Sequence, residues 1–88
     1  MMSRHAAVRA QQRAIPPIVV DWVVAYGRAI RHKGADTYYL DRKVRKKLKC
    51  EIGSIAFRRM EDLLDVYVVV SDDYTVITVG WRYKRLRH

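Results

Sequence analysis

The sequence predicts an α+β domain built around a small antiparallel sheet of about four strands. Three patterns indicate this class. Helix-forming segments open the chain, two pairs of short strand-like segments are each joined by a turn, and a basic helix pair separates those pairs. The expected order is ααββααββ, with the first two helices forming a hairpin. With 88 residues the chain has room for one core, so we expect a single domain over 1–88.

The first two helices are predicted from their ends. Residues 3–14 are good helix formers, and Ser3 is a suitable N-cap. Pro16 and Pro17 end this helix, because proline cannot continue the preceding hydrogen-bond ladder. Pro17 suits the first turn of a second helix at 18–26, which is apolar almost all round. The β-branched residues of 18–26 leave a buried strand as the alternative.

Strands are expected in two pairs. The first pair, 28–32 and 36–40, flanks Gly34, which suits the tight turn of a hairpin. The second pair is 66–70 and 75–83, and the continuous run of four valines and one tyrosine at 66–70 is typical of a strand covered on both faces. Alternation along the last strand puts Val76, Thr78, Gly80, Arg82 and Lys84 on one face, and Thr75, Ile77, Val79, Trp81 and Tyr83 on the other.

Between the two hairpins the sequence predicts a pair of helices. Asp41 is a suitable N-cap for the first, and Gly53 ends it. Ser54 is a suitable N-cap for the second. An apolar stripe of the second helix, expected to face inward, consists of Ala56, Met60, Leu63 and Leu64.

The charge of the chain predicts an anionic partner. Lysine and arginine number 18 against 9 acidic residues, and the formal charge is +9. RNA or DNA is the leading expectation, and an acidic protein comes second. Cys50 is the only cysteine, so no intrachain disulfide or zinc-type cysteine spacing exists, and we expect it to be a small buried filler. We expect a soluble cytoplasmic protein without metal, cofactor or membrane association.

One helical face carries the sharpest candidate site. His5, Arg9 and Arg13 stand four residues apart, so they project from one side of the first helix. A histidine can transfer protons near neutral pH, and arginines can hold a phosphate and stabilise its extra charge. Arg82, on the last strand, is the fourth candidate, as a phosphate ligand. The alternatives are a solvated helix face near Asp21 or Asp65, and a strand end exposed to water.

Further cations are candidates for binding a nucleic-acid backbone, since phosphate contacts need little beyond positive charge. We expect residues 84–88 to form a flexible basic tail. Aromatic residues near these cations, namely Tyr38, Tyr39, Trp81 and Tyr83, are candidates for stacking on unpaired bases, with a core role as the alternative. The predicted nucleic-acid-binding set is Arg42, Lys43, Arg45, Lys46, Lys47, Lys49, Tyr83, Lys84 and Arg85.

The run HAAVRAQQRAI at 5–15 and the VITV segment at 76–79 carry a family resemblance. They resemble a small uncharacterised prokaryotic family marked by His-x3-Arg-x3-Arg-Gly-Ile, with Ala14 here in the place of the glycine. That family is similar to the RelE/ParE-like toxins, within the barnase, EndoU, colicin and RelE fold group. The resemblance implies metal-independent cleavage of messenger RNA, with His5 close to Arg82, and an acidic antitoxin protein as partner.

Three function hypotheses follow. The first is a toxin-like, metal-independent endoribonuclease of a toxin-antitoxin system, with His5 as general acid or base and with Arg9, Arg13 and Arg82 on the phosphate. The second is a non-catalytic nucleic-acid-binding accessory protein of a mobile element or phage, which needs no histidine. The third is a basic adaptor that binds an acidic protein.

Overall fold

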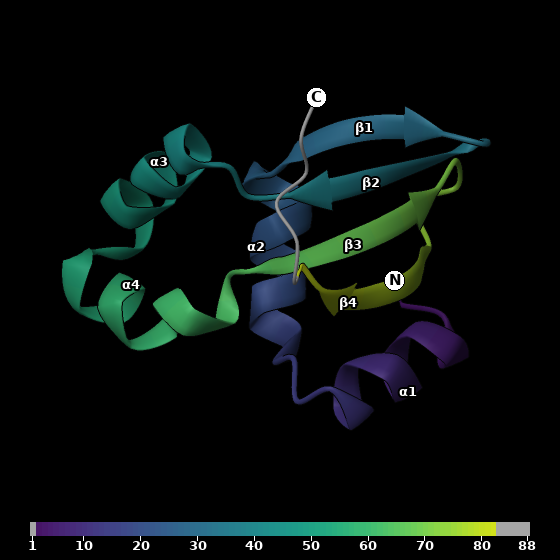
Figure 1. Ribbon diagram of the computed structural model, residues 1–88, viewed down its shortest axis with the longest axis horizontal. Coiled ribbons are helices and arrows are strands. Elements are labelled where there is room, and N and C mark those ends of the chain that lie inside the picture. The colour runs from purple at the N-terminus through teal and green to yellow at the C-terminus, as the bar shows by residue number, and fades with distance from the viewer. Residues whose placement is uncertain (1, 83–88) are drawn as a thin grey trace.

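The computed structural model describes residues 2–82 (Figure 1). Four strands form one antiparallel sheet in the order β1-β2-β3-β4, so the predicted α+β class and four-stranded antiparallel sheet are confirmed. Tyr83 and the basic segment 84–88 lie outside the described residues. In chain order the elements are α1 (Arg4–Gln12), α2 (Pro17–Tyr26), β1 (Arg28–His32), β2 (Ala35–Tyr39), α3 (Arg42–Ile52), α4 (Ser54–Met60), the 3-10 helix η1 (Glu61–Leu63), β3 (Val66–Ser71) and β4 (Val76–Trp81).

Local side-chain chemistry explains where the helices begin and end. The Ser3 hydroxyl accepts a hydrogen bond from the Ala6 amide at 3.1 Å, and the Asp41 carboxylate accepts one from the Val44 amide at 2.8 Å. Both are N-caps, which satisfy amides that have no partner inside the helix. Pro17 occupies the first helical turn of α2. Gly53 ends α3 with φ of 90°, a left-handed conformation that glycine adopts without steric cost.

The first two helices pack on the sheet separately. α1 packs along β4, and a parallel bridge between Met2 and Val76 holds its start there. α2 packs across β2 and β3, on the far side of the sheet in Figure 1. The expected hairpin of α1 and α2 is therefore not confirmed. The reason is the linker, in which Ala14 has a positive φ of 54° and the two prolines redirect the chain beneath the sheet.

Within residues 2–82, the helices cover only one face of the sheet. Along β3, Val66, Val68 and Val70 are buried, whereas Tyr67 and Val69 are half-buried. The expectation that β3 is covered on both faces is therefore confirmed for the side that α2 packs against and not for the other, where the described residues are half-buried. We call the side bearing Val68 the covered face. We call the other side the open face. Its residues are Arg28, Ile30, His32, Ala35, Thr37, Tyr39, Tyr67, Val69, Ser71, Thr78 and Gly80.

A β-bulge changes the alternation of β4. Val69 pairs with Thr78 and Val70 pairs with Val76, which leaves Ile77 as an extra residue. Val76 and Val79 are consequently both buried, although the sequence predicts them on opposite faces, and Ile77 is 38% exposed. Because the bulge shifts the period by one residue, strict alternation fails at the start of the strand and holds after it.

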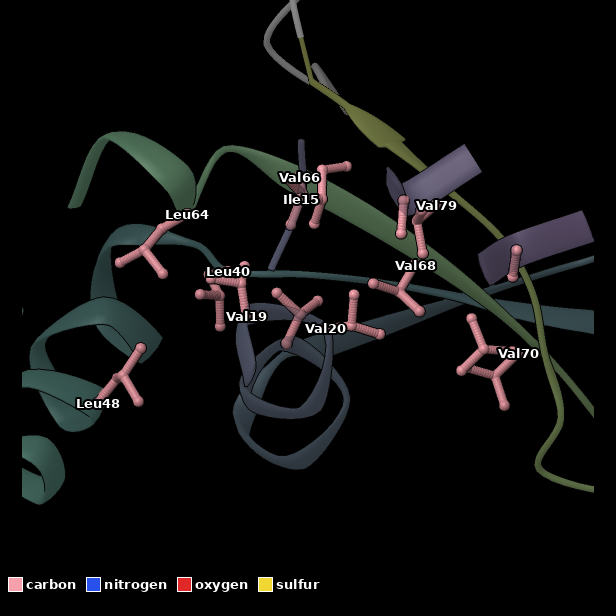
Figure 2. Close-up of a cluster of buried hydrophobic side chains, with 14 of the residues drawn as sticks. Ile15, Val19, Val20, Leu40, Leu48, Leu64, Val66, Val68, Val70 and Val79 are labelled. Atoms are coloured by element: carbon pink, nitrogen blue, oxygen red, sulfur yellow. The ribbon is translucent and has the colours of Figure 1, made fainter. Parts of the chain in front are cut away.

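The core lies between the covered face, α2, and the inner sides of α1, α3 and α4 (Figure 2). No charged or polar side chain is buried among the described residues. Within α4 the inward residue is Phe57, while Ala56 and Met60 are half-buried, so the predicted stripe is only partly right. The helix ends at Met60 and η1 changes the periodicity before Leu64. Gly53, rather than Ser54, occupies the N-cap of α4, because the turn after α3 is a single residue.

Candidate nucleic-acid interface

A cationic cleft lies at the end of the sheet where the chain leaves β2 and β4. Its volume is about 690 Å³. The α3 side chains form one wall, Phe57 and Glu61 form another, and Leu40 lies at the end of β2. Of the residues that the structure describes, five cations line it against two carboxylates, so an anion is the ligand that its electrostatics favour. The five are Arg42, Arg45, Lys46, Lys49 and Arg82.

Arg45 differs from the other cations because its guanidinium joins two parts of the fold. Its Nε donates to the Leu40 carbonyl at 3.2 Å, and its Nη2 donates to the Leu64 carbonyl at 3.2 Å and to the Asp65 carboxylate. Only 22% of this side chain is exposed. The sequence predicts that Arg45 binds phosphate, whereas these contacts indicate that it fixes α3 against the segment before β3.

The remaining α3 cations are exposed and differ in where they lie. Arg42, Lys46 and Lys49 line the cleft, and the Lys49 Nζ is 5.9 Å from the centre of the Phe57 ring. Lys43 lies beside a second, smaller hollow next to Asp41, and Lys47 lines neither of these two. The sequence treats all of these cations alike, whereas the fold gathers three of them around one space.

Arg82 connects the cleft to the open face. Its guanidinium carbon is 4.6 Å from the centre of the Tyr39 ring, and its Nη1 donates to the Leu40 carbonyl at 3.4 Å. The Nε is buried and has no hydrogen-bond partner among residues 2–82. Stacking and the single long hydrogen bond fix the orientation of the guanidinium and leave further N–H donors for an anion. Arg82, for which the sequence predicts phosphate binding, therefore lies in the lining of the cleft.

Arg13 reaches the same end of β4 from α1. Its Nη1 donates to the Val79 carbonyl at 3.3 Å, and its own carbonyl accepts from the Trp81 indole at 3.0 Å. A Cβ at Gly80 would lie only 2.6 Å from this Nη1 and 2.6 Å from the Tyr67 hydroxyl. Glycine at this position therefore gives room for an arginine and a tyrosine to lie together over the strand.

His5 and Arg9 are not brought to this end of the molecule. α1 runs along β4, with the Ser3 amide bonded to the Val76 carbonyl at 2.8 Å and Arg13 beside Trp81. His5 precedes Arg13 by two helical turns, about 12 Å along the axis. His5 is exposed and Arg9 is half-buried, and neither makes a side-chain hydrogen bond within the described range. The structure thus groups Arg13 with Arg82 at one end of β4 and leaves His5 toward the other.

The other sequence candidates have separate outcomes. Tyr38 and Trp81 are half-buried and pack against the core, as the alternative reading of these aromatics expects. Cys50 is exposed, so the expectation of a buried filler is wrong, because the inward side of α3 is occupied by Leu48. Among residues 2–82 no three His, Cys, Asp or Glu side chains gather as metal ligands do. None of the described helices has the length and apolar character needed to cross a membrane.

Tyr67 is the residue at this site that the sequence reasoning missed. It lies within the valine-rich run 66–70, for which the sequence predicts a strand covered on both faces. The signal in the sequence is the alternation of side chains along a strand. Tyr67 lies between Val66 and Val68, so its side chain must point away from the face that these two valines share.

Comparisons of this chain with protein-family models, with curated proteins and with solved structures found no significant match.

Proposed function

We propose that this protein binds nucleic acid, RNA or DNA, through phosphate contacts in the cationic cleft. The observation that carries the proposal is the convergence of α3 and Arg82 on one space. Three exposed cations of α3 and the oriented guanidinium of Arg82 line a single cleft of about 690 Å³. A phosphate entering it would neutralise charges that otherwise repel one another, and counterions would be released. The second hypothesis, a binding module without catalysis, agrees with this geometry without needing His5.

Salt-dependent binding tests this proposal. Anisotropy titrations of a labelled oligonucleotide should give a log affinity that falls linearly with log salt concentration. The double variant Arg42→Gln, Lys46→Gln removes two cations from the cleft and should lower the magnitude of that slope by about two. Arg58→Gln, Arg59→Gln removes the same charge from α4, where both residues lie outside the cleft, and is the matched control.

The two double variants separate a defined site from general attraction. A cleft variant that loses much more affinity than the α4 variant supports the proposal. Equal losses would mean that net charge alone attracts the polyanion, and the absence of binding at physiological salt would overturn the proposal. Tight binding of an acidic protein in that last case would favour the adaptor hypothesis or an acidic antitoxin.

A toxin-like, metal-independent endoribonuclease is the second candidate function. The observation in its favour is that Arg13 and Arg82 lie at the same end of β4. Arg13 lies close to the Tyr67 hydroxyl, and Arg82 lines the cleft. Two arginines can stabilise the charge that develops on a phosphate during strand cleavage. The test is incubation of RNA in EDTA with the wild type, Arg82→Ala and His5→Ala. Cleavage lost in both variants, with folding retained, would support this function and assign His5 a part in it.

A further inference from the structure

The open face carries a continuous row of side chains that leads away from the cleft. Strand register aligns Arg28, Tyr39, Tyr67 and Gly80 across all four strands, one residue from each. Residues in register share a face, so these side chains all lie on the side of the sheet that no described helix covers. Neighbouring strands are about 4.8 Å apart, so the row from Tyr39 to Gly80 is about 10 Å long.

Tyr67 is held flat in this row by the missing side chain of Gly80. A Cβ at Gly80 would lie 2.6 Å from the Tyr67 hydroxyl and 2.7 Å from its Cε2. The ring therefore extends from β3 across β4 and occupies the space above the glycine. Tyr67 is half-buried, so the residue keeps some contact with solvent on the open face. A ring ordered in this way loses little further conformational freedom when a planar group stacks on it.

Cations stand at both ends of the tyrosine pair. Arg82 stacks on Tyr39 at 4.6 Å and also lines the cleft, and Arg13 Nη1 lies over Gly80 beside Tyr67. Two tyrosines in the open row of a sheet would otherwise be ordinary surface residues. The flanking arginines add the second element of nucleic-acid recognition, because they provide phosphate contacts on either side of the rings.

This arrangement suits unpaired bases and not a duplex. Bases in a double helix are stacked on each other, and their flat surfaces are not accessible to a side chain that lies on a sheet. A single strand can turn its bases outward onto aromatic rings while its phosphates contact nearby cations. A row of about 10 Å has room for one or two bases.

Resting on the proposed function, we infer that the nucleic acid bound by this protein is single-stranded, with an unpaired base stacked on Tyr67 and the adjoining phosphates on Arg82 and in the cleft. This inference deepens the proposed function by stating the class of ligand. RNA and DNA share the chemistry, so both single strands are arms of its test.

The first test uses the wild-type protein and four oligonucleotides of equal length: single-stranded RNA, single-stranded DNA, a DNA duplex and a DNA strand of abasic sites. Removing the bases preserves the phosphates and removes only the stacking partners. We expect the two single strands with bases to bind at least about 5-fold tighter than the abasic strand, since stacking on an aromatic ring contributes about 5- to 150-fold per base. Equal binding of the abasic strand would overturn the inference, and so would tighter binding of the duplex.

Variants assign the effect to Tyr67. Tyr67→Leu should weaken single-strand binding by about 5-fold or more and leave duplex binding and the salt slope unchanged, whereas Tyr67→Phe should retain most of the affinity. Gly80→Ala, which forces the ring and Arg13 out of position, should resemble Tyr67→Leu. Thermal unfolding of each variant verifies that it folds. If Tyr67→Leu weakens duplex and single strand equally, the stacking inference fails while the proposed phosphate cleft stands. If the wild type binds no nucleic acid, the proposed function fails.

Discussion

The two faces of the sheet differ in composition although the same strands form both. The covered face contributes only apolar side chains to the core, with Val66, Val68 and Val70 each at most 3% exposed. The open face carries tyrosines, threonines, a histidine and Arg28, all half-buried or exposed. Because side chains alternate along a strand, adjacent residues serve different purposes. Stability should depend on one set of positions, and ligand binding on the set between them.

The largest expected effect compares two glycines. A Cβ at Gly27 would meet backbone carbonyls, that of Val23 in α2 and that of Tyr39 in β2 at 2.8 Å, and neither can move without shifting its element. At Gly80 the clashing atoms belong to the ends of side chains, which can turn away. We expect Gly27→Ala to lower the free energy of unfolding by about 3 kcal/mol and Gly80→Ala by about 1 kcal/mol. Urea denaturation measures both, and equal losses would contradict this reading of the two sites.

Two adjacent valines give the second and sharper comparison. Val68 is fully buried on the covered face, and Val69 is half-buried on the open face. Threonine has nearly the shape of valine, so Val68→Thr changes packing little but buries a hydroxyl that has no partner there. We expect a loss of about 1 to 3 kcal/mol in unfolding free energy at Val68 and less than about 0.5 kcal/mol at Val69. A similar loss at both positions would show that the open face is buried in solution.

The sequence predicts the elements well and their packing poorly, for physical reasons. Helix ends depend on neighbouring residues, and the capping side chains of Ser3 and Asp41 lie where their local sequence predicts. The side chains grouped at the cleft come from distant parts of the chain. No local pattern reveals that Arg45 would be committed to Leu64 or that Arg82 would stack on Tyr39. The sequence does not reveal the bulge at Ile77 either, because a strand with one extra residue has the same β-branched composition as a regular strand.

The candidate site was predicted in part for the same reason. Strand alternation predicts Arg82 and charge predicts the α3 cations, and the fold brings several of them together. His5, Arg9 and Arg13 share a helix face as the spacing requires. Spacing along a helix does not determine what the helix faces, and only Arg13 lies beside the end of β4 that Arg82 follows.

The smallest expected effect concerns Asp41, which lies between the open face and the cleft. Its carboxylate caps α3 through the Val44 amide and pairs with Arg28. The hydrogen bond from Val44 first, and then Arg28, lower the pKa of Asp41 below its ordinary value of 3.8. A lowered pKa means that the folded protein favours the charged carboxylate. The stabilisation is therefore complete above about pH 4 and is lost as pH falls through the pKa in the folded state. Asp41→Ala should lower the unfolding free energy by about 0.5 to 2 kcal/mol at neutral pH.

Asp41→Asn distinguishes the cap from the charge. Asparagine is an equally good N-cap, so this variant should keep most of the stability at pH 7 and lose the part of the acid dependence that Asp41 contributes. Unfolding curves for wild type, Asn and Ala variants between pH 3 and 7 would measure both terms. An Asn variant that is as unstable as the Ala variant at pH 7 would mean that the charge opposite Arg28, and not the hydrogen bond to Val44, holds the start of α3. Because α3 lines one wall of the cleft, a loosened helix start should also weaken oligonucleotide binding in the Ala variant more than in the Asn variant.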